Sequence, residues 1–210
     1  KIGAAFFSND SQDSLAYIIQ NYRLPKAVTA VLVGIGLSVS GLLMQTFFRN
    51  PLAGPYILGL SSGSSLGVAL LIMGSALFSG SIAQIFAGTI GVVLASCAGS
   101  ILVLLLIIIA SRKVQDAATL LIIGMMFSSF AGALVNVLSY FSSAEQLQKF
   151  TFWNLGNLGN LSWNAIVILS ICVGIGLLFT VLSIKSLDAL LLGENYAKSL
   201  GINISKTRIL

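Results

Sequence analysis

The sequence has 210 residues, of which 57% are hydrophobic and only 8% are charged. Soluble domains carry about a quarter charged residues, so this composition excludes a soluble domain and indicates an integral membrane protein. The net charge of +5 is scattered along the chain, without a basic stripe and interleaved aromatic residues, which argues against a nucleic-acid-binding surface. Because the apolar runs are too long for barrel strands, we predict an all-α fold, a polytopic transmembrane helical bundle.

The chain opens with a mixed segment, residues 1–26, which we place at the outer surface of the membrane. Apolar residues recur there at helical spacing from Leu15 onward and predict a short interfacial helix. The first predicted span is Ala27–Phe48, close in length to the roughly 20 residues that cross a bilayer as a helix. Pro25 stands just before it, where a helix readily starts because the missing N–H would have had no partner.

A stiff, charged elbow follows the first span. The residues that form it are Arg49, Asn50, Pro51 and Pro55. Its two prolines forbid a continuous helix, because proline lacks an N–H and its ring crowds the preceding turn. A second apolar run begins at Tyr56, so we predict a helical hairpin whose turn is the elbow.

Four more spans complete a region of five spans that runs over residues 27–184. Their predicted bounds are about Tyr56–Phe78, Ile82–Ala110, Ala117–Phe141 and Trp163–Ile184. A polar loop with aromatic residues, Ser142–Ser162, separates the last two spans. Residues 185–210 are amphipathic rather than spanning, and we assign them to a cytoplasmic segment. We expect residues 1–210 to be part of a single transmembrane domain.

Basic residues predict the orientation of these spans. With five spans, one side of the membrane holds Arg49, Arg112, Lys113, Lys185, Lys198, Lys206 and Arg208. The other side holds Lys1, Arg23, Lys26 and Lys149. Because cytoplasmic loops carry an excess of lysine and arginine, we predict that the first side is cytoplasmic.

Neither end of the sequence has the features of a natural terminus. Lys1 is not a start methionine, no signal-peptide pattern opens the chain, and residues 205–210 carry no terminal cap. We therefore expect the sequence to be part of a longer membrane protein.

The predicted spans contain polar residues but no charged ones. Proton-coupled carriers usually place an ionisable residue near the middle of the membrane, so this pattern argues against a secondary transporter. The neutral polar groups include Asn136 and Ser139. Asn136 is a candidate to face a path through the bundle, and a hydrogen bond to a neighbouring helix is the alternative that stays open.

The sequence offers little for catalysis. It has no histidine and its acidic residues are scattered, so we expect no metal site, no cofactor and no His-based catalytic group. Asp116, Asp188 and Glu194 stand alone, which disfavours a polytopic membrane enzyme. The two cysteines, Cys97 and Cys172, lie inside apolar runs, and we interpret them as packing residues.

The cytoplasmic segment has a pattern of its own. Residues 187–201 predict a short helix, a bend at Gly193, a second short helix and a terminating Gly201. Glu194 lies near the start of the second helix, where its charge suits the helix dipole. Two interpretations stay open: the second helix projects from the membrane as a handle for another protein, or it lies on the lipid surface.

Five short motifs follow one another along the chain. They are Arg-Leu-Pro-Lys at 23–26, Arg-Asn-Pro-Leu-Ala-Gly-Pro at 49–55 with Leu-Gly-Leu-Ser-Ser-Gly at 58–63, Leu-Leu-Ile-Ile-Gly at 120–124, Trp-Asn-Leu-Gly at 153–156, and Leu-Gly-Glu at 192–194 with Ala197, Leu200 and Gly201. In this order they resemble motifs of the permease subunits of ABC importers for iron-siderophores, haem and cobalamin, the FecCD-like type II importers. One such motif is weak evidence, whereas the ordered set covers most of the chain.

The chain departs from the family pattern at a few positions and in extent. Lys26 stands where arginine is usual, Gly54 where an acidic or amide residue is common, and Ser64 where alanine is usual. About ten spans are expected in a full-length chain of this family, and its later Pro-His motif has no match here. The resemblance therefore covers the second to sixth spans and the coupling loop.

The resemblance implies interfaces with two partner proteins. The residues expected to couple the permease to its ATPase are Gly193, Glu194, Ala197, Leu200 and Gly201. Arg23 and Lys26 match a basic pair that meets acidic residues of the substrate-binding protein. The alternative for these two residues is an ordinary interfacial anchor.

The resemblance also implies a path through the fourth span. The candidates for the inner gate and the lining of this path are Asp116, Thr119, Asn136 and Ser139. The first two fall at the cytoplasmic entrance of the span, where the family has its inner gate.

Partners and location follow from the same resemblance. An ATP-binding cassette ATPase would hydrolyse ATP, a periplasmic or lipid-anchored binding protein would deliver an iron chelate, haem or a corrinoid, and a second permease subunit, identical or paralogous, would complete a dimer. The chain would be a multi-pass protein of the inner membrane and not an enzyme, in agreement with its lack of a Gly-rich phosphate loop. A secondary transporter or channel without an ATPase is the alternative function.

Overall fold

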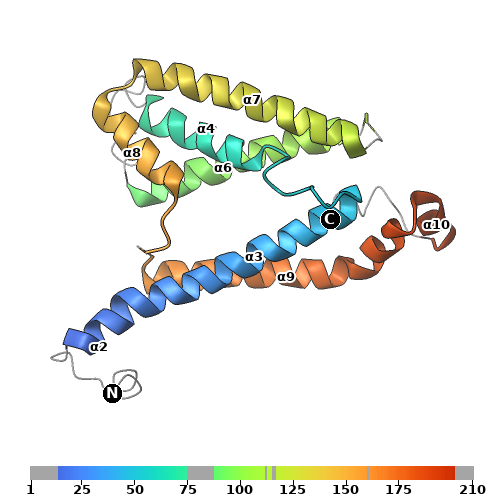
Figure 1. The fold of residues 1–210 in the computed structure, drawn as a ribbon, viewed down its shortest axis with the longest axis horizontal. Helices are drawn as coiled ribbons and strands as arrows, with labels where there is room; N and C mark the ends of the chain where they lie inside the picture. The colour runs from blue at the N-terminus through green and yellow to red at the C-terminus, as the bar shows by residue number, and fades with distance from the viewer. Residues whose placement is uncertain (1–13, 75–87, 112, 115–116, 160, 202–210) are drawn as a thin grey trace. The chain divides into compact units, whose positions relative to one another are not determined.

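The computed structural model describes residues 14–74, 88–111, 113–114, 117–159 and 161–201, and every regular element within these ranges is a helix (Figure 1). The elements are α2 (Ser14–Ile18), η1 (Ile19–Arg23), α3 (Leu24–Phe48), α4 (Leu60–Ile72), α6 (Thr89–Ser111), α7 (Ala117–Phe141), α8 (Ala144–Leu155), α9 (Trp163–Leu191) and α10 (Glu194–Ser199). This confirms the predicted all-α class. The chain divides into two units, and the first contains α2, η1, most of α3, α9 and α10. The second unit is Met44–Gly156.

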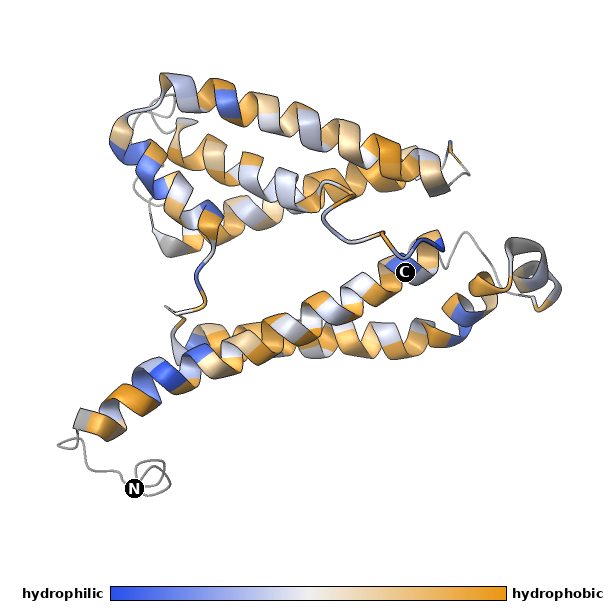
Figure 2. Cartoon of the chain, viewed as in Figure 1, coloured by the Kyte–Doolittle hydropathy of each residue, from blue (hydrophilic) through white to orange (hydrophobic). Residues whose placement is uncertain are grey.

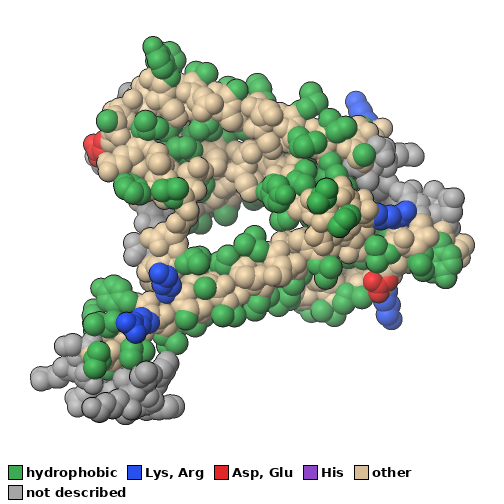
Figure 3. Space-filling model, viewed as in Figure 1, with side chains coloured by type: hydrophobic (Ala, Val, Ile, Leu, Met, Phe, Trp, Pro, Cys, Tyr) green, Lys and Arg blue, Asp and Glu red, His purple; other side chains and the backbone are tan. Residues whose placement is uncertain are grey.

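Within the described ranges, four helical stretches are long and apolar enough to cross a membrane. They are Leu15–Phe48, Ile90–Ser111, Ala118–Phe141 and Trp163–Leu191. Figure 2 shows apolar residues along α6 and α9, and Figure 3 shows lysine and arginine side chains near helix ends. A helical membrane bundle requires this distribution, because a charge is costly within the hydrocarbon and tolerable at its surface.

The second predicted span, Tyr56–Phe78, is shorter in the structure. α4 covers only Leu60–Ile72, and residues 75–78 lie outside the described ranges. Turns occupy the preceding stretch, where the Ile57 amide donates to the Gly54 carbonyl at 3.0 Å. Gly59, with a φ of 80°, then starts the helix, a conformation that favours glycine. At 1.5 Å per residue, α4 is about 20 Å long, less than the roughly 30 Å hydrocarbon core.

The helix of the first span begins earlier than predicted. α2, η1 and α3 follow one another without a break, so the surface helix expected near Leu15 is continuous with the span and Pro25 does not start a helix. In the wide turn before Pro25 the Leu24 amide donates to the Ile19 carbonyl, five residues back. A proline ring clashes with the carbonyl four residues before it, and one π turn displaces that carbonyl and lets the helix continue.

α4 is the central helix of the second unit and contacts α6, α7 and α8 (Figure 1). It crosses α6 at glycines, since a Cβ at Gly63 would lie 2.6 Å from the Gly99 carbonyl oxygen. A Cβ at Gly67 would meet the Ala95 carbonyl oxygen in the same way. Small residues at a helix crossing let the two backbones approach closely, which favours van der Waals packing between helices in a membrane. The close crossing of α4 and α6 is therefore the central helix contact of the second unit.

Polar and apolar contacts complete the second unit. The Ser64 and Ser96 hydroxyls form a hydrogen bond of 2.8 Å, and the Ser100 hydroxyl donates to the Leu60 carbonyl at 3.1 Å. The two buried apolar clusters are Val68, Ala69, Met73 and Phe150, and Leu58, Val103 and Ile107. The first cluster joins α8 to α4, and the second joins α6 to the turns that precede α4.

The predicted loop Ser142–Ser162 contains a helix, α8. Ser143 and Gln146 form a capping box: the Gln146 amide donates to the Ser143 hydroxyl at 3.3 Å, and the Gln146 side chain accepts from the Ser143 amide at 3.0 Å. Phe150 is buried against α4 and stacks on Trp153. The Ser-x-x-Gln signature of a capping box was present in the sequence and could have predicted this helix.

In the first unit, α9 continues beyond the predicted end of its span at Ile184. It runs to Leu191, so the expected short helix before Gly193 is the last part of α9. α10 then folds back and buries Ala197 against Ala189 and Leu190. The tail is therefore a compact extension of a spanning helix.

Candidate functional site

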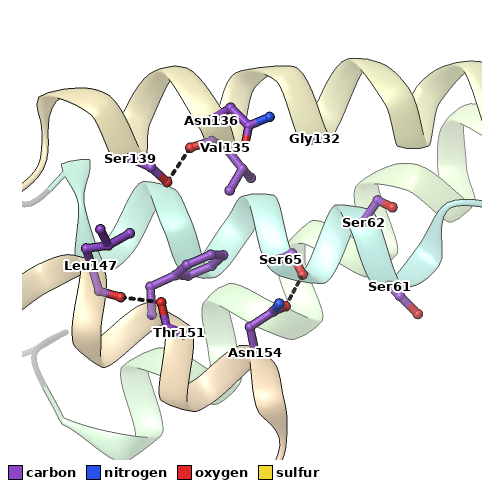
Figure 4. Close-up of a pocket in the computed structure, with 11 residues that line it drawn as sticks. Ser61, Ser62, Ser65, Gly132, Val135, Asn136, Ser139, Leu147, Thr151 and Asn154 are labelled. Carbon is purple, nitrogen blue, oxygen red and sulfur yellow. Dashed lines mark hydrogen bonds between the residues drawn. The ribbon is translucent and has the colours of Figure 1, made fainter.

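A polar groove of about 410 Å³ lies among α4, α7 and α8 (Figure 4). Its polar lining consists of Ser61, Ser62, Ser65, Asn136, Ser139, Thr151 and Asn154. Two of these residues, Asn136 and Ser139, were predicted to line a path. The groove is open, with Ser61, Asn136 and Asn154 exposed, and it gathers hydroxyl and amide groups on an otherwise apolar unit, which makes it the strongest candidate site in the described part of the chain.

Helical spacing places these groups on the groove. Ser61 and Ser65 are one turn apart on α4, and Asn136 and Ser139 are nearly one turn apart on α7, so each pair shares a helix face. The glycine face of α4 meets α6 at the same time, because Gly63 and Gly67 alternate with the serines around the helix. One short helix thus supplies both a close contact and a polar wall.

Some lining groups are already hydrogen-bonded. The Ser65 hydroxyl donates to the Asn154 Oδ1 at 3.2 Å, which links α4 to α8 (Figure 4). The Ser139 hydroxyl donates to the Val135 carbonyl, and the Thr151 hydroxyl donates to the Leu147 carbonyl, each at 2.8 Å. These bonds hold the lining side chains in fixed orientations and still leave lone pairs exposed to the groove.

Other lining residues have side chains that make no hydrogen bond within the described residues. Ser61, Ser62 and Asn136 have none, and the Asn154 amide nitrogen stays free because only its oxygen accepts from Ser65. Ser61, Asn136 and Asn154 are exposed and Ser62 is half-buried, so these groups are open to water or to a ligand. The groove is therefore suited to a hydrated or hydrogen-bonding occupant.

The lining contains no ionisable side chain among the described residues. The nearest charges along α8 are Glu145 and Lys149, which form an exposed ion pair of 2.8 Å with each other. The hydrogen bond from Lys149, together with its positive charge, lowers the pKa of the Glu145 carboxyl below its ordinary value. These two charges neutralise each other and lie outside the groove lining.

Thr119, one of the two gate candidates, does not line the groove. Asp116 lies outside the described residues, and Thr119 is a half-buried residue near the start of α7. Thr119 is 17 residues before Asn136 in the same helix, about 25 Å along its axis. Thr119 therefore lies at the opposite end of α7 from the groove residues Asn136 and Ser139.

The basic pair lies at the wide turn in the first helix. Arg23 ends η1, Lys26 lies in the first turn of α3, and both side chains are exposed. Beside them Tyr17 and Tyr22 pack edge to face, with ring centroids 6.3 Å apart. Exposed basic and aromatic side chains at one helix end are typical of the membrane–water interface.

The elbow is tied together by its own polar groups. The Leu52 amide donates to the Asn50 Oδ1 at 2.9 Å, and the Gln45 side chain donates to the Pro51 carbonyl at the same distance. Arg49 has a φ of 47°, a left-handed conformation that ends α3. The chain turns at the predicted elbow, and these hydrogen bonds add to the effect of the prolines.

The chain after Pro55 docks tightly on α7. Pro55 is half-buried, and a Cβ at Gly124 would lie 2.7 Å from both the Ile57 carbonyl oxygen and the Leu58 Cα. Gly59 also approaches α7, since its Cβ would lie 3.0 Å from the Ser128 hydroxyl. This contact holds the serine-rich start of α4 in place along the groove.

The predicted coupling segment is a tight bend and a short helix. Gly193 has a φ of 121° and Gly201 a φ of 77°, so glycines stand at both ends of α10. The Ala197 amide donates to the Gly193 carbonyl at 2.9 Å, and Ala197 is fully buried. Glu194 begins α10, and Leu200 is exposed just beyond it. Ala197 thus packs within the segment, whereas Leu200 belongs to its surface.

Several groove residues were not predicted as site residues. Thr151 and Asn154 lie on α8, a helix that the sequence analysis assigned to a loop. Ser61, Ser62 and Ser65 lie in a stretch rich in small residues, where serine more often serves close packing. Only the meeting of three helices distinguishes these residues from packing serines.

The sequence matches a known family of transport proteins over its whole length. The model of the FecCD transport family matches residues 1–210. The chain belongs to the FecCD transport family. The resemblance inferred from the motifs is thereby confirmed over the whole chain.

Curated relatives of this FecCD chain are permeases. It is 34% identical over 204 residues to the hemin transport system permease protein of Yersinia pestis, covering 97% of this chain and 60% of the relative. It is 30% identical over 192 residues to the vitamin B12 import system permease protein of Vibrio cholerae, covering 91% and 55%. This FecCD chain therefore spans little more than half the length of these relatives.

A solved structure supports the same fold. An inward-facing metal-chelate type ABC transporter has a TM-score of 0.77 and 32% sequence identity to this FecCD chain. The match covers 96% of this chain and 62% of that one. The helical arrangement is therefore that of an ABC transporter permease.

Proposed function

We propose that this chain belongs to the permease subunit of a binding-protein-dependent ABC importer for an iron-siderophore, haem or cobalamin-type ligand. The observation that carries the proposal is the match to the FecCD family over residues 1–210. Relatives named for hemin and vitamin B12 transport support the ligand range. In this function the permease binds no ATP itself, and a separate ATPase subunit supplies the energy.

The polar groove serves as part of the translocation path. Asn136 and Ser139 from α7 and Asn154 from α8 offer hydrogen bonds without charge. A path must bind its ligand weakly enough to release it, and scattered neutral groups meet this need better than a tight charged site. The ligand moves past hydroxyl and amide groups that replace part of its hydration.

The α10 segment serves as the contact with the ATPase. α10 is held on α9 by the buried Ala197, and the exposed Leu200 beside it offers an apolar surface. A rigid short helix at the end of a long spanning helix transmits a push from a partner into the bundle. Gly193, Glu194 and Gly201 complete this interface in the proposal.

The ATPase contact is tested by co-purification. The full-length protein is co-expressed with its cassette ATPase, as wild type and as Glu194→Arg, and the ATPase retained per permease is measured. We expect at least a tenfold loss with Glu194→Arg, because a reversed charge in an interface leaves both partners unpaired. Glu145→Arg, an equal charge change on α8, is the control and retains the ATPase; equal retention by both variants contradicts the assignment.

The binding-protein contact is tested at Arg23 and Lys26. Reversal of both charges to glutamate is expected to lower the association rate of the binding protein about tenfold at low salt, with a smaller effect at high salt. Surface plasmon resonance with the permease in nanodiscs measures this rate. Lys185→Glu, an exposed charge on α9, is the matched control. An unchanged association rate in the double variant assigns the pair to lipid anchoring instead.

A further inference from the structure

We propose that the wide turn η1 positions Tyr17 and Tyr22 beside Arg23 and Lys26 as the aromatic part of the docking surface for the binding protein. The proposal rests on the proposed function, which assigns the basic pair to this partner, and it adds two contact residues and the turn that places them. The observation that carries it is the edge-to-face contact of the two tyrosine rings, whose centroids are 6.3 Å apart. We call Tyr17 and Tyr22 the tyrosine pair.

The contact within the tyrosine pair depends on the wide turn. The two residues are five positions apart, and in a regular α-helix their side chains would point about 140° apart around the axis. The π turn Ile19–Arg23 has hydrogen bonds that reach five residues back, so it brings residues with this spacing toward one face. The Asn21 side chain also donates to the Tyr17 carbonyl at 3.1 Å. Both rings remain exposed, at 53% and 59%, so the pair is held in place without being buried.

Pro25 fixes the wide turn at this place in the helix. Proline has no N–H to donate and its ring needs room, so the backbone just before it departs from the regular α pattern. The Leu24 amide bonds to the Ile19 carbonyl there. Pro25 is buried, and the Thr29 hydroxyl donates to its carbonyl at 2.8 Å as the regular helix resumes. The orientation of the tyrosine pair is therefore built into the backbone.

The tyrosine pair and the basic pair form one surface. Lys26 is three residues after Arg23 and four after Tyr22, spacings that share a helix face, and all these side chains are exposed. Figure 3 shows lysine and arginine beside hydrophobic side chains at this end of the first helix. Tyrosine and arginine are enriched among the residues that contribute most to protein interfaces. Two cations beside rigid aromatic rings suit a protein surface with acidic residues around an apolar pocket.

The length of the first span places Tyr17 beyond the lipid. Residues 27–48 carry no charge and form about 33 Å of helix, close to the roughly 30 Å hydrocarbon core, so Lys26 lies at its boundary. Tyr17 is nine residues before Lys26, about 13 Å farther along the axis, whereas the headgroup layer is about 5–7 Å thick. The ring of Tyr17 is therefore accessible to a protein in the water, beyond the depth at which tyrosine anchors a helix in lipid.

Binding kinetics distinguish the tyrosine pair from the basic pair. Surface plasmon resonance measures both rates for the cognate binding protein on the full-length permease with its ATPase in nanodiscs. Tyr17→Ala and Tyr22→Ala are each expected to raise the dissociation rate about tenfold and to leave the association rate unchanged at low and high salt, because uncharged rings do not steer the encounter. Tyr17→Phe and Tyr22→Phe keep the ring and stay near wild type. Tyr56→Ala, an exposed tyrosine beyond the opposite end of α3, is the matched control and keeps the wild-type rates.

A shift of register tests whether the wide turn positions the pair. One alanine inserted after Gln20 rotates Tyr17 by about 100° relative to Tyr22 and leaves Arg23 and Lys26 unchanged in α3 and at its start. The insertion is expected to raise the dissociation rate about tenfold, as Tyr17→Ala does. Tyr17→Ala added to the insertion is expected to have no further effect, because both changes remove the same contact. A wild-type dissociation rate for the insertion variant overturns the proposal.

The same kinetics separate this proposal from the proposed function. If the binding protein binds wild type and dissociates from Tyr17→Ala and Tyr22→Ala at the wild-type rate, the tyrosine pair belongs to the membrane interface and only this proposal is overturned. An equal rise in the dissociation rate for Tyr56→Ala overturns it as well. A wild-type permease that binds no binding protein overturns both proposals together.

Discussion

Replacement of Gly99 by alanine is expected to lower the free energy of unfolding of the permease by about 1–3 kcal/mol. The added Cβ would meet the Gly63 carbonyl oxygen, and backbone atoms cannot move aside as a flexible side chain can. The α4 and α6 axes must therefore separate, which weakens the Ser64–Ser96 hydrogen bond and the contacts of Val103. The polar groove depends on this crossing because α4 forms one of its walls.

The matched control for Gly99→Ala is Gly174→Ala, which is expected not to lower the free energy of unfolding. A Cβ at Gly174 on α9 meets nothing within 4 Å among the described residues. Gly174→Ala is therefore expected to be neutral or to stabilise by up to about 1 kcal/mol, since alanine favours a helix more than glycine does. Thermal unfolding of both variants in the same detergent measures the difference. Equal stability of the two variants contradicts the close crossing of α4 and α6.

Substitution of Gly193 by valine is expected to reduce ATP-driven uptake at least tenfold. The φ of 121° at Gly193 is a conformation that residues with a side chain rarely adopt. Such strain costs about 1–3 kcal/mol, comparable to what a single short helix gains from burying one alanine. α10 would then lose its position on Ala189 and Leu190, and movement of the ATPase would no longer reach α9.

Two readouts separate this effect from a general loss of structure. Gly193→Val is expected to leave the association of the binding protein and the thermal stability near wild-type values, because α10 is a small part of the fold. Gly174→Val, the same exchange in the body of α9, is the control for the added side chain. Wild-type uptake by Gly193→Val would show that the bend at Gly193 is not needed for coupling.

Apolar periodicity predicted the long helices well. The fourth predicted span, Ala117–Phe141, has the same bounds as α7, because polar residues flank a largely apolar run without charges or prolines. The prediction that a helix starts at Pro25 was wrong, because a π turn lets the helix continue past the proline. A π turn has no recognisable sequence pattern. The length of the second span was also overestimated. Residues between Pro51 and Gly59 form turns in the structure, although they are as apolar as residues of a spanning helix.

The groove was only partly predictable. Asn136 was predicted to line a path because it is a polar carboxamide within a largely apolar run. Ser61 and Ser65 gave no such signal, since serine in a membrane helix more often serves packing. Asn154 lies on α8, whose capping box was overlooked, and its bond to Ser65 joins residues 89 positions apart. Contacts over that separation arise from tertiary packing, which single-sequence patterns do not encode.

The most direct test of the central claim is the energy source for uptake. The full-length permease is reconstituted in vesicles with its ATPase and binding protein, and uptake of a labelled chelate is measured with ATP, without ATP, and with an ion gradient alone. We expect uptake only with ATP and all three proteins. Uptake driven by a gradient without the ATPase would contradict the account and identify a secondary transporter.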